Sequence, residues 1–574
     1  MTRYIQKVFL FLLLSTCGVT GCTSPFKPEA VRIRWSTDPQ TLDPLVASKP
    51  QAAEILNLLH CSLLVGDSSQ QFSPWLAQTL PIVSQRDSLT LLTYTLRPEA
   101  TWDNGQPVLA RDVAFTLKVF NCPGLSTEYA RTQYGFVTDI ELDNQNPRRF
   151  TLICRTASRD IIFSSGDYAI LPEYILDPQK QLQAIPLSLL HSDTVAAVRR
   201  YPALRSFARR YRQSSFGQHP ERLPGCGPYT LKAWEKGRYV RLQRKARWWA
   251  TQLKAPPVWL QAHASRLDYQ IIPDNAQALL ALRRGDIDLY PMPTARDFKQ
   301  LRHSADTTQL AFYTADSYQM MTVGFNTQRP LLRDALTRRA LSLLFDVPGL
   351  MQATQPGLAY RSVSLISPYE KPAYNDSLPL IPYDLRQAAE LLRQAGWQRR
   401  SDGSWKRSAT ETLDLSISYL AGVPDYEAVA RQFRAAAAQL GVAVKLSPTE
   451  EQLYKQQLIN GNTDLYIRTA SGSPLTYNFM PVLHSRSIGI GNFPRYQSKV
   501  ADQLMEAIVY EQDESRRIKL LRRFQLQIRQ DSPLVVLFFI RNRLIASKQL
   551  RGVKPLRVRP GYDVLNLSSA LSGT

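Results

Sequence analysis

Cysteine and histidine are the residues of this chain with the most specific chemistry, and their spacing decides what they could do. The six histidines, at positions 60, 191, 219, 263, 303 and 484, are scattered, and no two of the six cysteines have the C-x-x-C spacing of a metal site. His60 and Cys61 are adjacent, but neighbours in a helix do not share a face. The pattern predicts a protein that holds neither a metal ion nor another cofactor.

Motifs that place a catalytic group are absent from the sequence. It contains no G-x-S-x-G nucleophile elbow, no H-E-x-x-H zinc motif and no glycine-rich phosphate loop. Nucleophilic, metal-assisted and phosphoryl-transfer chemistry each need such a motif to position the reacting group. We therefore predict that the protein is not an enzyme, and we keep an enzyme as the less favoured alternative.

The N-terminus has the features of an export signal. Two basic residues precede an apolar run from Val8 to Leu14, which is too short to span a bilayer. The next segment, Val19 to Cys22, resembles a bacterial lipobox, in which the chain is cleaved before the cysteine and its thiol is diacylated. We expect residues 1–21 to be a signal peptide, residues 22–29 a tether, and Cys22 a lipid anchor to the cell envelope. An ordinary signal peptide with a coincidental cysteine is the alternative.

The chain is strongly basic, with a formal net charge of +22 over 574 residues. Export argues against a nucleic-acid partner, and the basic residues form no single motif. They are densest between residues 199 and 247. We interpret them as a solvated cationic face, with contact to anionic lipid headgroups or a cell-wall polymer as the alternative. The length allows two or three domains.

Residues 92–120 contain a strand, a turn and a helix in close succession. Apolar residues alternate from Leu92 to Leu96 as in a half-buried strand, and Asp103-Asn104-Gly105 is typical of a tight turn. Pro107 then leads into a helix whose apolar residues repeat at i, i+4 and i+7 from Val113 to Phe120. The segment predicts a compact unit in which the turn joins the strand to the helix.

This strand, Trp-bearing turn and Arg-Asp-Val helix resemble the signature of the extracellular solute-binding proteins of the peptide/nickel group, family 5, which serve ABC importers. Further blocks match that group in the expected order over nearly the whole mature chain. They are Thr41 to Pro44, the hairpin that begins Gly225-Cys226-Gly227-Pro228-Tyr229, the helix and Gly-Asp-Ile-Asp element at 274–289, the strand and helix at 323–346, and the helix at 384–397.

The resemblance implies an α/β protein with the two-lobed periplasmic-binding-protein fold (type II), which closes over its ligand as a hinged clamp. An extra inserted α+β domain belongs to lobe one, and we expect a single helix from Val195 to Arg212 within it. The expected boundaries are 30–78, 217–290 and 530–574 for lobe one, 79–216 for the inserted domain and 291–529 for lobe two.

The resemblance also implies the ligand, an oligopeptide or related small molecule that a monomeric, lipid-anchored protein passes to an ABC permease complex. In the group, a lobe-two aspartate meets the α-ammonium of the peptide, but the matching segment here, Asp464 to Pro474, has Ser471 or Gly472 in its place. Arg468 adds a cation that would suit a carboxylate, phosphate or other anionic group. We expect an oligopeptide-like ligand whose amine is recognised differently. The alternatives are a surface sensor, adhesin or folding helper, or a carrier of nickel, haem or an anion.

Candidate ligand-binding residues come from the N-terminal segment, the inserted domain and lobe two, and for each the alternative is a packing or surface role. They are Ala47, Ser48, Tyr129, Tyr134, Asn326, Arg468, Ser471, Ser473 and Tyr477. Two aromatic residues of the matching blocks, Phe325 and Trp397, are predicted to be core.

Four cysteines remain for disulfides once Cys17 leaves with the signal and Cys22 is acylated. An exported protein permits disulfides, and four cysteines allow three connectivities. The expected domains place Cys122 with Cys154 and Cys61 with Cys226. That grouping favours these two pairs, while four free thiols stay open as the alternative.

Overall fold

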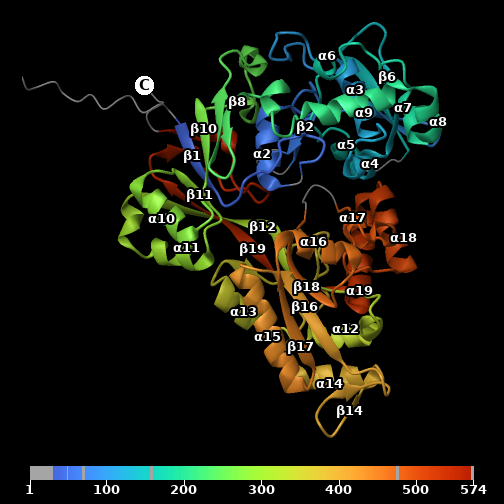
Figure 1. Ribbon diagram of the computed structural model, residues 1–574, viewed down its shortest axis with the longest axis vertical. Helices are drawn as coiled ribbons and strands as arrows, with labels where there is room; N and C mark the ends of the chain where they lie inside the picture. The colour runs from blue at the N-terminus through green and yellow to red at the C-terminus, as the bar shows by residue number, and fades with distance from the viewer. Residues whose placement is uncertain are drawn as a thin grey trace, which may run out of the picture.

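A computed structural model describes residues 30–47, 49–66, 71–155, 159–192, 194–472 and 477–569. It shows two lobes joined by long strands (Figure 1). We call the part whose core is drawn from residues 31–289 and 544–567 lobe one, and the part whose main core is drawn from residues 321–540 lobe two. The predicted signal peptide, tether and lipid anchor, together with Ser48 and Ser473, lie outside the described residues.

One mixed sheet runs through both lobes. Its strands lie in the order β17 (Ala443–Thr449), β16 (Asp414–Leu420), β18 (Leu465–Ser471), β12 (Leu310–Phe325), β19 (Leu534–Ser547), β11 (Leu289–Pro291), β1 (Ala30–Trp35), β10 (Arg266–Ile271), β9 (Tyr239–Arg244) and β8 (Tyr229–Glu235), and β13 (Ala359–Tyr360) pairs with β19. Parallel pairs occur within each lobe, β16 with β17 and β18, and β1 with β10 and β11.

Two long antiparallel strands, β12 and β19, connect the lobes. Their pairing extends from Leu310 opposite Ser547 to Gly324 opposite Leu534. The register shifts between Ala315 and Gln319, and at this irregularity Arg541 Nε lies 3.0 Å from an Asp316 carboxylate oxygen. The chain therefore enters lobe two along β12 and leaves it along β19, with the break in register between the two cores.

The glycines of the predicted hairpin are required by close packing in lobe one. The strands β8 and β9 form as predicted, with Gly237 at φ 73° in the turn between them. Before the hairpin, a Cβ on Gly225 or Gly227 would lie 1.9 Å or 2.4 Å from a backbone carbonyl oxygen at the end of α2 (Pro50–Leu59). Only glycine allows this approach.

Two of the blocks that carried the family resemblance, the Trp-bearing turn and the hairpin with the segment after it, meet at one place, which we call the junction. Lys245 pairs with Asp103 of the Trp-bearing turn and donates to the Gly225 carbonyl at 2.9 Å. The indole N–H groups of Trp248 and Trp249 both donate to the Cys226 carbonyl, at 3.0 Å and 2.9 Å. The junction therefore ties the inserted domain to the hairpin of lobe one.

The inserted domain has its own four-stranded sheet, in the order β4 (Ile82–Arg86), β5 (Leu89–Thr95), β7 (Arg149–Cys154) and β6 (Val137–Leu142). The predicted turn and helix are confirmed, because Gly105 has φ 82° and Asp112 of α3 (Ala110–Phe120) accepts a hydrogen bond from the Leu109 N–H at 2.9 Å. The other helices are α4 (Glu128–Tyr134), α5 (Arg159–Ser164), α6 (Glu173–Leu176), α7 (Leu187–Ser192), α8 (Thr194–Arg200) and α9 (Ala203–Ser214).

The prediction of one helix from Val195 to Arg212 is wrong. The structure divides this segment into α8 and α9, with the break at Tyr201 and Pro202. A proline has no N–H to donate and its ring disfavours helical backbone in the residue before it, so the first helix ends there and the second begins just after. The expected apolar face persists, since Leu204 and Phe207 are buried.

Lobe two packs helices on both faces of its part of the sheet. Asp384 caps α14 (Leu385–Gln394) as predicted, accepting a hydrogen bond from the Gln387 N–H at 2.9 Å. Phe325 and Trp397 are confirmed as core, at 0% and 1% exposure. The helices are α12 (Ala335–Ser342), α13 (Val347–Thr354), α14 (Leu385–Gln394), α15 (Pro424–Leu440), α16 (Glu451–Asn460), α17 (Met480–Leu483), α18 (Lys499–Tyr510) and α19 (Glu514–Asp531).

A further small core lies beside β11, where α10 (Asn275–Arg284) and α11 (Ala295–Arg302) pack together. Gly285 ends α10 at φ 71°, as the sequence predicts for a residue that follows a helix. The expected boundary at residue 290 falls between these two packed helices. The domain boundaries stay a prediction. The remaining short strands are β2 (Leu64–Gly66), β3 (Phe72–Pro74), β14 (Gln398–Arg399), β15 (Trp405–Lys406), β20 (Leu550–Arg551) and β21 (Ser568–Ser569).

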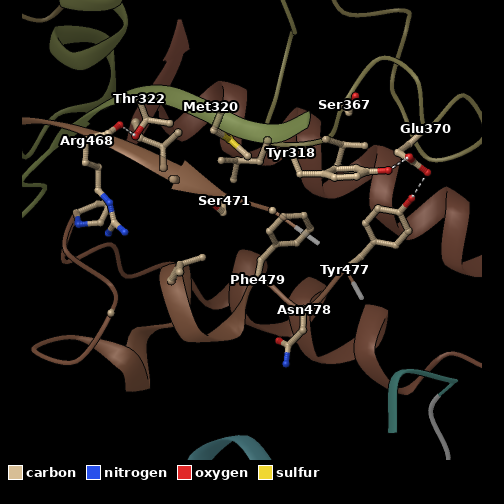
Figure 2. Close-up of a pocket in the computed structure, with 18 of the residues that line it drawn as sticks. Tyr318, Met320, Thr322, Ser367, Glu370, Arg468, Ser471, Tyr477, Asn478 and Phe479 are labelled. Carbon is tan, nitrogen blue, oxygen red and sulfur yellow. Dashed lines mark hydrogen bonds between the residues drawn. The ribbon is translucent and has the colours of Figure 1, made fainter. Parts of the chain in front are cut away.

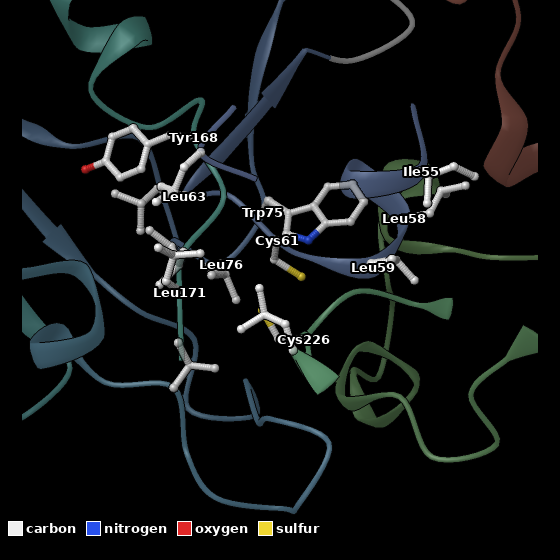
Figure 3. Packing of buried hydrophobic residues seen from close by; sticks show 14 of the residues in the cluster. Ile55, Leu58, Leu59, Cys61, Leu63, Trp75, Leu76, Tyr168, Leu171 and Cys226 are labelled. Atoms are coloured by element: carbon white, nitrogen blue, oxygen red, sulfur yellow. The ribbon is translucent and has the colours of Figure 1, made fainter. Parts of the chain in front are cut away.

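The four cysteines outside the N-terminal segment are free and buried, so neither expected disulfide is present in the structure. Cys122 directs its sulfur at the Leu204 carbonyl, 3.7 Å away, rather than at Cys154. Cys61 and Cys226 do lie together in the lobe-one core, beside Trp75 (Figure 3). Burial, together with the neighbouring Cys226 thiol, raises the pKa of the Cys61 thiol.

Candidate ligand-binding site

A cavity of about 260 Å³ lies in lobe two, where β12 and β18 meet the loops around residues 365–370 and 477–494 (Figure 2). Its apolar wall consists of Met320, Leu365, Ile366, Ala470, Phe479, Val482, Pro494 and Leu534. Its polar wall includes Tyr318, Thr322, Ser367, Glu370, Tyr466, Arg468, Ser471, Tyr477 and Asn478. A site for a drug-sized ligand typically has about 300–1,000 Å³, so this cavity has room for a small ligand or for part of a larger one.

Two paired strands supply the floor of the cavity. Met320 lies opposite Ala470 and Thr322 opposite Arg468 in the antiparallel register of β12 and β18. Because side chains two apart on a strand point to the same face, these residues line one surface. The Thr322 hydroxyl donates to the Arg468 carbonyl at 3.1 Å, which fixes the strand beneath the guanidinium.

A carboxylate held by several partners forms one end of the cavity. Glu370 accepts hydrogen bonds from the hydroxyls of Tyr318, at 2.5 Å, and Tyr477, at 3.3 Å. Arg557, which comes from the C-terminal segment after β20, places a guanidinium nitrogen 3.6 Å from the same carboxylate and stacks over the Tyr318 ring at 4.8 Å. Desolvation and the Glu370 carboxylate both raise the pKa of the Tyr477 hydroxyl, so it stays a donor.

An arginine without an acidic partner in the described structure lies at the other end. The Arg468 guanidinium is 5.0 Å from the centre of the Phe493 ring, and no carboxylate of the described residues lies within ion-pair distance of it. Its charge acts to lower the pKa of Tyr454 and Tyr466, against the larger effect of burial, which raises both. Figure 2 shows Arg468 and Glu370 on opposite sides of the apolar residues.

Three of the predicted ligand-binding residues, Arg468, Ser471 and Tyr477, come together in this cavity. Asn326 does not line it. Its side chain is buried and donates to the carbonyls of Gly461 and Thr463, at 2.9 Å and 3.1 Å. This amide therefore holds the turn that leads into β18.

The other predicted residues that the structure describes lie in lobe one. Ala47 packs against the lobe-one core. Tyr129, on α4, is 75% exposed, whereas Tyr134 packs on Phe120 with ring centres 5.4 Å apart. Their role as ligand contacts stays a prediction.

Several cavity residues were missed from the sequence. Glu370 lies in a loop without a recognisable motif, and Phe479 follows the segment that departs from the family pattern. The sequence does contain a signal for Tyr318, Met320 and Thr322. These residues are two apart and directly precede the recognised block at Val323, so they lie on one face of the same strand. That face lines the cavity.

The two lobes approach one another on the side of this cavity. Helices α4 and α5 of the inserted domain face α17 and α18 (Figure 1). Across the lobes, Lys49 lies 3.8 Å from Glu451 at the start of α16. The segment 477–483, which forms one wall of the cavity, is therefore close to where lobe one covers lobe two.

The described residues bring no three His, Cys, Asp or Glu side chains together as a metal site. No helix in the described part of the chain is long and apolar enough to cross a bilayer.

Comparison with known proteins agrees with this fold. The oligopeptide-binding protein AppA of Bacillus subtilis is 21% identical over 575 residues, which cover 97% of this chain and 96% of that protein. The structure of AppA in complex with a nonapeptide superposes with a TM-score of 0.76 at 19% identity, covering 94% of this chain and 99% of AppA. NikZ from Campylobacter jejuni, in complex with Ni(L-His), superposes with a TM-score of 0.73 at 18% identity over 94% and 99% of the two chains.

These neighbours share the two-lobed α/β fold, and that prediction is confirmed. Residues 71–488 match the model of the bacterial extracellular solute-binding proteins, family 5 Middle. The matched segment covers most of the chain. It contains all the blocks that carried the resemblance except the one from Thr41 to Pro44. The chain belongs to the bacterial extracellular solute-binding proteins of family 5.

Proposed function

We propose that the protein binds an oligopeptide-like ligand between its lobes and delivers it to an ABC permease, without catalysing a reaction. The observation that carries this proposal is the lobe-two cavity, which combines an apolar wall with charged ends and lies beside the facing lobe. A bound peptide would place one or two side chains there and run its main chain along the space between the lobes. The peptide complex of AppA is consistent with such an arrangement in the same fold.

The proposal includes the location of the protein. Residues 1–21 act as an export signal, Cys22 carries the lipid, and residues 22–29 tether a monomer to the envelope. The boundaries of the lobes and of the inserted domain follow those expected from the sequence. Ala47, Ser48, Tyr129, Tyr134 and Ser473 contribute further ligand contacts, as the sequence predicts.

Native mass spectrometry of the soluble form that begins at Thr23, purified from an exporting host, tests the proposal. We expect a series of adducts at peptide masses. A bare mass that stays bare after incubation with mixed peptides, or an adduct at the mass of a metal chelate, would contradict peptide binding.

Matched variants connect such adducts to the cavity. Ala470→Trp places an indole in the cavity, whereas Ala438→Trp adds the same group on the exposed face of α15. We expect the first variant to lose the peptide adducts and the second to keep them. Adducts retained by both would place the ligand elsewhere.

A further inference from the structure

The two charged ends of the cavity differ in how completely their charge is compensated. Glu370 already has two hydroxyl donors and the Arg557 guanidinium within 3.6 Å. A ligand ammonium at this end would compete with Arg557 for the carboxylate. The Glu370 end is therefore built to hold tyrosines and the C-terminal segment in place rather than to receive a ligand cation.

Arg468 is in the opposite situation. Its guanidinium rests on the Phe493 ring, and the described residues around it supply no carboxylate. The neighbouring hydroxyl groups, those of Tyr454 and Tyr466, have pKa values raised by burial, so they stay neutral and do not compensate the charge. A guanidinium offers several N–H donors in a planar fork, and a carboxylate matches that fork with two parallel hydrogen bonds.

We propose that the cavity receives an apolar group that carries a carboxylate, and that Arg468 binds this carboxylate while the apolar part packs on Met320 and Phe479. This inference rests on the proposed function and names the chemistry of its ligand. In a peptide, the carboxylate belongs either to an acidic side chain or to the C-terminus.

The composition of the cavity favours a carboxylate over a phosphate. Arg468 is the one cation among the described lining residues, and Glu370 lines the same cavity. A phosphate dianion would leave about one charge uncompensated and would be repelled by Glu370, whereas a carboxylate is neutralised by a single guanidinium. The apolar wall between the two ends suits the methylene or aromatic group that carries the carboxylate.

Two small probes test the carboxylate site independently of peptide binding. Phenylpropionate and its neutral isostere phenylpropionamide would be titrated by ligand-observed NMR into the protein and into Arg468→Met. Because a charge-assisted hydrogen bond contributes about tenfold to hundredfold in affinity, we expect the wild type to prefer the acid by such a factor. The preference should vanish in Arg468→Met and persist in the control Arg386→Met, whose arginine is 93% exposed on α14.

The source of the carboxylate is decided with the tetrapeptides Ala-Phe-Glu-Ala and Ala-Phe-Gln-Ala, each with a free and an amidated C-terminus. A preference that follows the Glu residue assigns an acidic side chain, and one that follows the free C-terminus assigns the chain end. Equal binding of acid and amide probes, binding of neither, or a preference that survives Arg468→Met would overturn the inference. Failure of the tetrapeptides alone, with the probes still discriminated, would overturn peptide binding and leave the carboxylate site standing.

Discussion

The junction of lobe one and the cavity of lobe two use cations and aromatic rings in opposite ways. At the junction, Lys245 pairs with Asp103 and donates to a backbone carbonyl, and both tryptophans donate to the Cys226 carbonyl. In the cavity, Arg468 rests on an aromatic ring and has no acidic partner among the described residues. At the junction, these polar groups are paired within the protein. In the cavity, the Arg468 guanidinium is available to a ligand.

This difference separates residues that make the fold from residues that make the site. The blocks that identified the family contribute to the junction, to caps and to cores. The cavity draws largely on residues outside those blocks. A family resemblance therefore predicts the architecture of this chain better than it predicts what the chain binds.

The sharpest way to break the junction is to add one methyl group. Gly225→Ala would bring a Cβ to 1.9 Å from the Leu59 carbonyl oxygen, a backbone atom that cannot move aside. We expect a loss of more than about 3 kcal/mol in the free energy of unfolding, or failure to fold. Gly237→Ala is the control, because its Cβ meets nothing within 4 Å and the cost is limited to about 1–2 kcal/mol of backbone strain. Chemical denaturation measures both, and equal losses would contradict the argument.

The thiols beside the junction give the next test. Cys61 and Cys226 are free and lie together in the apolar core of lobe one. We expect alkylation of the denatured, unreduced protein to label Cys61, Cys122, Cys154 and Cys226. Cys61→Ser should lower the unfolding free energy by about 1–3 kcal/mol, because a hydroxyl costs more than a thiol to bury in an apolar core. Labelling of Cys122 and Cys154 only would contradict the free state of the pair.

A buried acid in lobe one predicts a pH dependence. Burial raises the pKa of Glu54 from its usual 4.5 to about 7, although Tyr562 donates a hydrogen bond to it at 2.6 Å. The folded state therefore binds this proton more tightly than the unfolded state. Its contribution to stability is complete below the unfolded pKa and is lost as the pH rises to about 7, which amounts to about 3 kcal/mol.

Denaturation of the wild type and of Glu54→Gln between about pH 5 and pH 8 measures this contribution. We expect a downward slope for the wild type and a flatter profile for the variant. Parallel profiles would show that Glu54 is not the group responsible.

A substitution in the cavity should not lower the unfolding free energy as a substitution at the junction does. Arg468→Met removes a charge without an acidic partner in the described structure, so we expect the unfolding free energy of the ligand-free protein to stay within about 0.5 kcal/mol or to rise slightly. Denaturation of protein freed of ligand by unfolding and refolding measures this. A loss above about 2 kcal/mol would mean that Arg468 stabilises the fold and would weaken the contrast between the two regions.

The smallest expected effect is at the contact between the lobes. Lys49→Met removes the pair with Glu451, whose side chain is 63% exposed. Exposed pairs contribute about 0–1 kcal/mol, and salt screens them. Small-angle scattering at low ionic strength should show a slightly more open ligand-free protein, with the difference from wild type reduced in high salt. Identical scattering profiles of the variant and the wild type at low salt would show that this pair does not affect closure of the lobes.

Much of the fold follows from the sequence because its determinants are local. Asp384 and Gly285 mark helix ends through their own side chain or backbone, and the two-residue turn at Gly237 fixes the hairpin. The segment from Val195 to Arg212 is not one helix, because the backbone restriction at Pro202 outweighs the apolar periodicity around it.

The site was less predictable because its residues meet only through tertiary structure. Arg468 could be identified because it stands in a segment where the family has an acid, but Glu370 is nearly a hundred residues away in a loop without a motif. Asn326 shows the reverse error. It follows a recognised strand as a ligand-binding residue would, yet its amide is used by two carbonyls of its own lobe.

The strands that connect the lobes have a mechanical consequence. Both ends of the described chain belong to lobe one, where β21 lies beside β1, and lobe two is entered along β12 and left along β19. A force applied between residues 30 and 569 therefore loads lobe one first. It reaches lobe two by pulling apart two antiparallel strands from one end, so their hydrogen bonds open one after another instead of sharing the load. In a single-molecule pulling experiment, lobe one should yield as a separate event and lobe two should follow at lower force.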